Sequence, residues 1–182
     1  MENDIKTPWI LAGYELFSKY GPDGLKVEAL ARIVNKNKSS FYHHFADLDL
    51  FINRLLEYHI KQSEIITKRE SQCKAVVPEL LNVIIEFKQD LLFNRQLRIH
   101  RNEERYLQCF QTASQGVTSA IVDIWAAELG IVNDSNLARM VLNLSIENFY
   151  LQITDKTLTY EWLEAYVNQL KCMVQAFQNN NA

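Results

Sequence analysis

Apolar residues recur every three or four positions along most of this chain, which is the spacing that predicts amphipathic helices. In residues 5–20 such a stripe contains Ile10, Tyr14 and Phe17. Pro8 suits the first turn of this helix, where a missing N–H costs nothing, and Gly21 can end the helix in a left-handed conformation. The pattern therefore predicts a first helix of about four turns.

A short second helix is predicted over residues 25–34, and a third over residues 38–45. Asn35 adopts positive φ more easily than most residues, so it can turn the chain between them. Asn37 is a candidate N-cap for the third helix. Two short helices joined by a turn of about three residues form a helix-turn-helix.

The rest of the chain keeps the helical period, and no segment shows the alternation of a strand. Asp47 is a candidate N-cap for a long fourth helix ending near residue 71. Further helices are predicted over residues 78–95, 101–115, 117–130, 134–154 and 159–177. The fold class predicted is all-α with about nine helices, divided into a helix-turn-helix domain at residues 1–47 and a helical domain at residues 48–182.

Composition agrees with long helices and restricts where the protein works. The chain has only five glycines and three prolines. It has no apolar run of about 20 residues, the length that a membrane span needs, and its first residues lack the basic start of a secretory signal. Three scattered cysteines, without C-x-x-C spacing, suggest reduced thiols. We therefore expect a soluble, cytoplasmic protein with no membrane partner.

Charge is unevenly distributed, although the whole chain has a formal net charge of −3. Residues 19–45 hold five lysines and arginines and two acidic residues, a local charge of +3. Phosphate contacts need only local cations, so a basic region on an acidic protein suits one DNA-contacting face.

The segment "KSSFYHHFADLDLF", residues 38–51, crowds polar and aromatic side chains together. A recognition helix places its N-terminal residues at the base edges and phosphates of the major groove. Tyr42 and His43 lie four residues after Lys38 and Ser39, so they share that helix face, whereas Phe41 and Phe45 would pack inward. One helix thus has a polar outer side and an apolar inner side.

The longer stretch "GLKVEALARIVNKNKSSFYHHFADLDLF" resembles the DNA-binding head of the tetracycline-repressor (TetR/AcrR) family of bacterial transcription regulators. The resemblance covers about residues 5–55. It is carried by apolar and aromatic positions that match the family pattern: Val27, Leu30, Ala31, Phe41, Tyr42, His43, Phe45 and Phe51.

Five positions, in three places along the chain, depart from that family pattern. Asn35, Lys36 and Asn37 replace a Gly-Val-Ser turn, and the Lys36 stem can cover apolar surface while its ammonium reaches a phosphate. Leu48 replaces a lysine that touches the DNA backbone, and Lys26 replaces a threonine that caps the second helix.

The resemblance implies a sequence-specific DNA-binding transcriptional regulator, in most such cases a repressor that a small-molecule effector releases from a palindromic operator. The residues expected to contact double-stranded DNA are Lys26, Lys36, Asn37, Lys38, Ser39, Ser40, Tyr42 and His43.

The resemblance also implies that the C-terminal domain forms a homodimer and binds the unknown effector. The apolar stripes of the last two helices give the candidate dimer residues Leu137, Met140, Val141, Leu144, Leu163, Val167, Leu170, Val174 and Phe177. Candidate lining residues of an apolar effector pocket are Phe87, Phe93, Tyr106, Phe110 and Trp125, each of which could equally belong to the ordinary core.

Other classes of function find little support. His43 and His44 are adjacent and point about 100° apart on a helix, with no third ligand at metal-site spacing. There is no G-x-S-x-G elbow, no P-loop and no G-x-G-x-x-G. We expect no enzyme activity, metal or cofactor. The alternative left open is an all-α small-molecule-binding or interaction protein that has lost operator binding.

Overall fold

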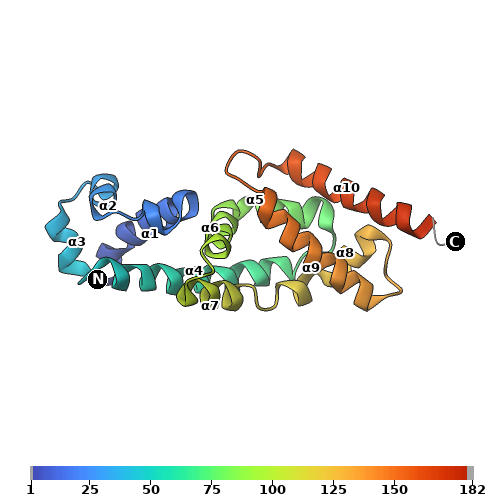
Figure 1. Ribbon diagram of the computed structural model, residues 1–182, viewed down its shortest axis with the longest axis horizontal. Helices are drawn as coiled ribbons and strands as arrows, with labels where there is room; N and C mark the ends of the chain where they lie inside the picture. Colours follow the sequence, from blue (N-terminus) through green and yellow to red (C-terminus); the bar gives the residue numbers. More distant parts are fainter. Residues whose placement is uncertain (1, 180–182) are drawn as a thin grey trace. The chain divides into compact units, whose positions relative to one another are not determined.

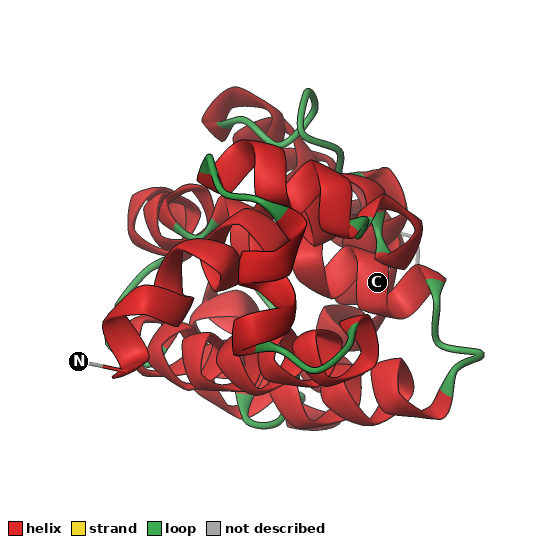
Figure 2. Cartoon of the chain, turned by 90° about the vertical axis from the view of Figure 1, so that its left-hand side faces the viewer, coloured by secondary structure: helices red, strands yellow, loops and turns green. Residues whose placement is uncertain are grey.

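The computed structural model of the chain describes residues 2–179, and all regular elements in that range are helices (Figures 1 and 2). The prediction of an all-α fold is thus confirmed. The α-helices are α1 (Glu2–Tyr20), α2 (Val27–Val34), α3 (Lys38–His44), α4 (Leu48–Glu70), α5 (Leu81–Glu86), α6 (Lys88–Ile99), α7 (Glu104–Ala113), α8 (Val117–Leu129), α9 (Ser135–Gln152) and α10 (Tyr160–Asn179). Two single turns of other helix types, η1 (Pro22–Gly24) and η2 (Val76–Leu80), precede α2 and α5.

The chain forms two compact units. Met1–Glu64 and Gln89–Ala113 make up the first, called the head unit below. Ile65–Lys88 and Ser114–Ala182 make up the second, called the body unit. Helix α4 contributes residues to both units. The predicted boundary at residue 47, between a DNA-binding domain and an effector-binding domain, stays a prediction.

Two details of the predicted helices are wrong. The single helix expected over residues 78–95 is interrupted at Phe87, whose φ of −101° and ψ of 27° are not helical. The chain passes from the body unit to the head unit just after this break, but the apolar stripe stays in phase, so periodicity does not reveal it. Pro8 lies inside α1 because that helix already begins at Glu2.

A buried hydrogen-bond network joins three helices of the head unit. The Tyr14 hydroxyl donates to Asp90 Oδ1 at 2.7 Å and lies 2.6 Å from His59 Nδ1. The other ring nitrogen, His59 Nε2, lies 2.9 Å from Asn94 Oδ1. The Phe93 ring stacks on both Tyr14 and His59 at centroid distances of 4.4 Å. Burial lowers the pKa of His59 to about 4, which favours the neutral imidazole near neutral pH.

Helix α10 is bonded to both α9 and α8 within the body unit. The Tyr166 hydroxyl of α10 donates to the carbonyl of Ser145 in α9 at 2.7 Å. Lys171 in α10 forms an ion pair of 2.8 Å with Glu128 in α8. These contacts give each of the two C-terminal helices one covered side within its own chain.

Glu70, at the end of α4, is an unusual buried acid in the body unit. Its side chain is 5% exposed, and its Oε2 atom has no hydrogen-bond partner among the described residues. Burial without a partner penalises the carboxylate and raises the pKa of Glu70 to about 7. Between about pH 4.5 and pH 7, the Glu70 carboxyl group is therefore protonated in the folded protein and ionised in the unfolded chain.

Replacing Glu70 with glutamine should stabilise the protein in a pH-dependent way. Because the folded-state pKa is raised, wild-type stability is highest below the unfolded pKa of about 4.5 and is lost as pH rises to about 7. We expect Glu70→Gln to increase the free energy of unfolding by about 2 kcal/mol at about pH 8 and by much less at about pH 5. Urea denaturation at the two pH values measures this, and an equal gain at both would contradict the argument.

Candidate nucleic-acid interface

The turn between α2 and α3 has the local geometry expected from its two asparagines. Asn35 lies in the left-handed region, with φ 54° and ψ 49°, and ends α2. The Lys36 N–H then donates to the Ala31 carbonyl at 2.9 Å. Asn37 Oδ1 accepts from the Ser40 N–H at 2.8 Å and caps α3. Lys26 precedes α2 without making a side-chain cap.

The inner side of α3 is held by aromatic packing. The Phe41 side chain is 0% exposed, and Phe45, which follows the helix, is also buried. The Phe41 ring meets the edges of Trp9 from α1 and Phe51 from α4, at centroid distances of 5.5 Å and 5.3 Å. Phe45 packs on Phe51 at 4.9 Å. These rings fix which side of α3 faces away from the head unit.

Close approach of α1 to α4 depends on a glycine. A Cβ atom at Gly13 would lie 2.4 Å from Phe51 Cζ and 3.1 Å from a Leu55 methyl carbon. No side chain fits in that space without moving Phe51, whose ring also touches Phe41 and Phe45. The glycine therefore contributes indirectly to the position of α3.

The outer side of α3 is polar and accessible. Tyr42 is 55% exposed, and Ser39 and His43 are also exposed, while Ser40 is half-buried. Before the helix, Lys26, Lys36 and Asn37 are exposed as well. The structure thus gathers the predicted DNA-contacting residues on α3 and on the segments before α2 and α3. Their contact with DNA stays a prediction.

Lys38 has a partner that the sequence did not reveal. Its ammonium lies 2.6 Å from Glu28 Oε1 in α2, and both side chains remain mostly exposed. The hydrogen bond between them raises the pKa of Lys38 and lowers the pKa of Glu28. The two residues are ten positions apart, and only the geometry of the turn brings them together.

The candidate effector-pocket residues belong to two different units. Phe93 and Tyr106 are fully buried in the head core, and Phe110 packs beside that core. Phe87 is half-buried and Trp125 is buried, both in the body unit. None of the five lines the pocket of the head unit that lies between α1 and α4. Their role in effector binding stays a prediction.

The candidate dimer residues divide by exposure. Leu163, Val167 and Val174 are buried within the chain, and Val141 and Leu170 are half-buried. The remaining four are exposed, with Met140 at 63% and Leu144 at 68%; the others are Leu137 and Phe177. These four exposed members have the most surface that another chain could cover.

Residues 2–179 show no arrangement typical of two other classes of site. No group of three or more histidine, cysteine, aspartate or glutamate side chains is placed to hold a metal ion in this part of the chain. Within the same range, no helix combines the length and apolar character that crossing a membrane requires.

Comparison with known proteins agrees with the helix-turn-helix. Residues 10–49 match the family model of bacterial regulatory proteins of the tetR family. This match confirms the resemblance to the TetR family that the sequence of the helix-turn-helix indicated. No curated protein sequence matches the chain.

Two solved structures share the fold along nearly the whole chain. One, from Rhodococcus sp., is described as a TetR-family transcriptional regulator; it is 16% identical with a TM-score of 0.59, over 96% of this chain and 98% of the other. A second, described in the same way and from Mesorhizobium loti MAFF303099, is 16% identical with a TM-score of 0.56, over 97% of each chain.

Removing the cap of α3 should loosen that helix locally. Asn37→Ala leaves the Ser40 N–H without its side-chain acceptor, a loss of about 1 kcal/mol. We expect amide hydrogen exchange in α3 to accelerate about fivefold, while Asn37→Asp, which keeps an acceptor, changes it little. Ser39→Ala, at an exposed neighbouring position, serves as the control. Unchanged exchange in Asn37→Ala would show that the cap does not hold α3.

Proposed function

We propose that this chain, which carries the N-terminal domain of the tetR family, is a DNA-binding transcriptional regulator whose α3 reads an operator in the major groove. The main support for this proposal is the geometry of α3, which buries Phe41 on one side and exposes Tyr42 on the other. A helix of this kind, second in a helix-turn-helix, is the element that enters the groove in such domains.

The exposed residues fall into two expected roles. Lys26, Lys36 and Lys38 carry charge toward phosphates, which supplies affinity without reading the sequence. Tyr42 and His43 stand further along the same face, where contact with base edges or the sugar-phosphate backbone sets register. The local charge of +3 in residues 19–45 provides the attraction, although the chain as a whole is acidic.

The ion pair between Lys38 and Glu28 shapes this role for Lys38. Its ammonium would exchange a carboxylate for a phosphate on binding, because both groups compete for the same cation. An exposed pair contributes little to stability, so the exchange costs little. Glu28 nevertheless places a negative charge beside the DNA-facing surface and should weaken binding.

A homodimer is the second part of the proposal. Leu137, Met140 and Leu144 leave an exposed apolar row at spacings of three and four residues on α9, and Phe177 is exposed on α10. Two copies related by a two-fold axis would cover these side chains and match the symmetry of a palindromic operator. Two helices from each chain would form the interface.

Repression, release by a small-molecule effector and action in the cytoplasm complete the proposal, on the strength of the family resemblance. One observation in the body unit favours a ligand there. The indole Nε1–H of Trp125 is buried without a hydrogen-bond partner among the described residues. A bound effector with an acceptor oxygen would supply that partner.

The alternative is an all-α binding protein that has lost operator recognition. It is favoured by the pairing of Lys38 with Glu28 and by Leu48, which packs beside the head core instead of offering a cation. The two proposals differ in one measurable property, which is specific binding to DNA.

Substitutions on α3 should weaken binding to the DNA upstream of the protein's own gene. We expect Tyr42→Ala and Lys38→Ala each to raise the dissociation constant about tenfold or more in fluorescence anisotropy. Glu28→Gln should lower it, because a repelling carboxylate is removed, and this gain should shrink as salt increases.

Lys68→Ala, near the end of α4, controls for the loss of any cation. Equal binding by wild type, Tyr42→Ala and Lys38→Ala would refute the assignment of α3. Equal affinity of the wild type for upstream and unrelated DNA would favour the alternative.

Charge on the exposed row of α9 should break the dimer. In Leu144→Glu, two carboxylates would be buried close together at a two-fold interface, which is strongly unfavourable. Sedimentation should show a dimer for the wild type and a monomer for the variant at micromolar concentration. Ile65→Glu, at a half-exposed position on α4, is the matched control and should stay dimeric. A monomeric wild type would refute this part of the proposal.

A further inference from the structure

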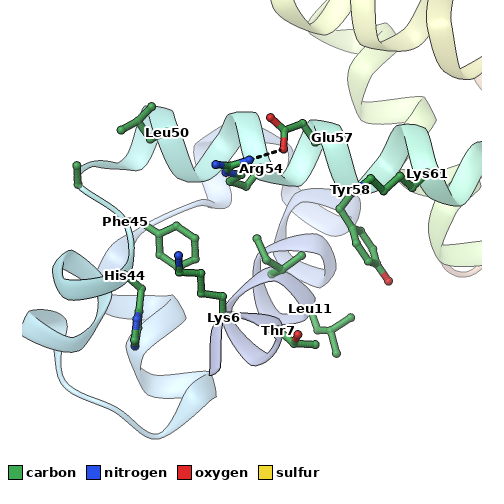
Figure 3. A pocket seen from close by; sticks show the side chains of 12 residues that line it. Lys6, Thr7, Leu11, His44, Phe45, Leu50, Arg54, Glu57, Tyr58 and Lys61 are labelled. Carbon is green, nitrogen blue, oxygen red and sulfur yellow. Dashed lines mark hydrogen bonds and ion pairs between the residues drawn. The ribbon is translucent and has the colours of Figure 1, made fainter. Parts of the chain in front are cut away.

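The head unit contains an open pocket of about 560 Å³ that the proposed function does not use. It lies between α1, the link from α3 to α4, and α4 (Figure 3). Its volume is within the range typical of small-molecule sites. Apolar atoms come from Ile10 and Leu11 of α1, from Phe45, and from Leu50 and Tyr58 of α4.

The apolar lining is incompletely covered. Leu11 and Leu50 are 48% and 50% exposed, although both border the pocket. The Phe45 ring faces the pocket between α1 and α4 (Figure 3). An apolar ligand body in this space would remove leucine surface from water without displacing any buried side chain.

The charged lining has a clear sign. Lys6 of α1 and Arg54 and Lys61 of α4 line the pocket, and Glu57 is the one carboxylate among the lining residues that the structure describes, so these four groups sum to +2. Glu57 already pairs with Arg54 at 2.8 Å. Arg54 and Lys61 are seven residues apart and therefore share one face of α4, two turns from each other. The Lys6 side chain extends from α1 toward the Phe45 ring in the view of Figure 3.

We propose that this pocket binds a small amphipathic carboxylate, with the apolar body against Phe45, Leu50 and Tyr58 and the carboxylate among the cations of α1 and α4. An arginine can hold a carboxylate through two parallel N–H groups, and its remaining donors can still serve Glu57. A net positive, partly apolar pocket on a chain with net charge −3 selects an anion with a hydrocarbon part over a neutral molecule.

The proposal concerns the protein without DNA, so it does not depend on the proposed function. Operator phosphates could also meet these cations, but they would leave the apolar lining uncovered. Decanoate, decan-1-ol and inorganic phosphate are therefore suitable probes, because they separate the contributions of charge and hydrocarbon.

Isothermal titration calorimetry of the DNA-free protein, with decanoate below its micelle-forming concentration, tests the proposal. We expect saturable binding of one decanoate per chain, at least tenfold weaker binding of decan-1-ol, and no competition from equimolar phosphate. Absence of saturable decanoate binding, equal binding of the alcohol, or displacement by phosphate would each overturn the proposal.

Two variants locate the site. Leu50→Glu places a carboxylate at the pocket edge and should weaken decanoate binding at least tenfold, whereas Ile99→Glu, a similarly exposed position of the head unit outside the pocket, should not. Glu57→Gln removes the one carboxylate among the described lining residues and should tighten binding about threefold, a gain that misfolding cannot produce. If Leu50→Glu or Glu57→Gln leaves the affinity unchanged, the ligand binds elsewhere and the assignment of the pocket is wrong.

Discussion

Aromatic packing around Phe41 is the interaction on which the rest of the head unit depends. Its ring is enclosed by Trp9 and Phe51, and the Phe51 ring in turn needs the space that Gly13 leaves on α1. A seven-residue helix such as α3 is too short to be stable by itself in water. Burial of the Phe41 side chain therefore stabilises α3 and fixes its orientation within the head unit.

Because the inner side of α3 is fixed by apolar contacts, its outer side is free to be polar. Tyr42 can stay exposed at little cost, and Ser39 and His43 are also exposed, so none of the three is needed in the core. Electrostatics on this surface are balanced locally. Glu28 partly compensates Lys38 while DNA is absent, which limits self-repulsion among the cations and moderates affinity for any polyanion.

Four polar side chains in the interior of the head unit are hydrogen-bonded to one another. Tyr14, His59, Asp90 and Asn94 are all largely buried, and each finds a partner within 2.9 Å. Such a network holds three helices in a single arrangement, because a shift of one helix would leave a buried polar atom unpaired. In the body unit, the buried Oε2 atom of Glu70 has no hydrogen-bond partner among the described residues. Burial therefore disfavours its carboxylate form and raises its pKa. The charged groups of the pocket beside Phe45 differ from both, because they remain in contact with water and need no buried partner.

The sequence alone determined the all-α class, the helix-turn-helix, the left-handed Asn35, the Asn37 cap and the inward phenylalanines. Each of these depends on hydrogen bonds or side-chain spacing within about four residues, which are visible in the order of amino acids. Only the tertiary structure decided the break at Phe87, the pairing of Lys38 with Glu28, the burial of Phe93 and Tyr106 in the head core, and the cationic pocket. These features join residues from different helices, so they depend on how the helices pack, and helical periodicity carries no information about which faces will meet.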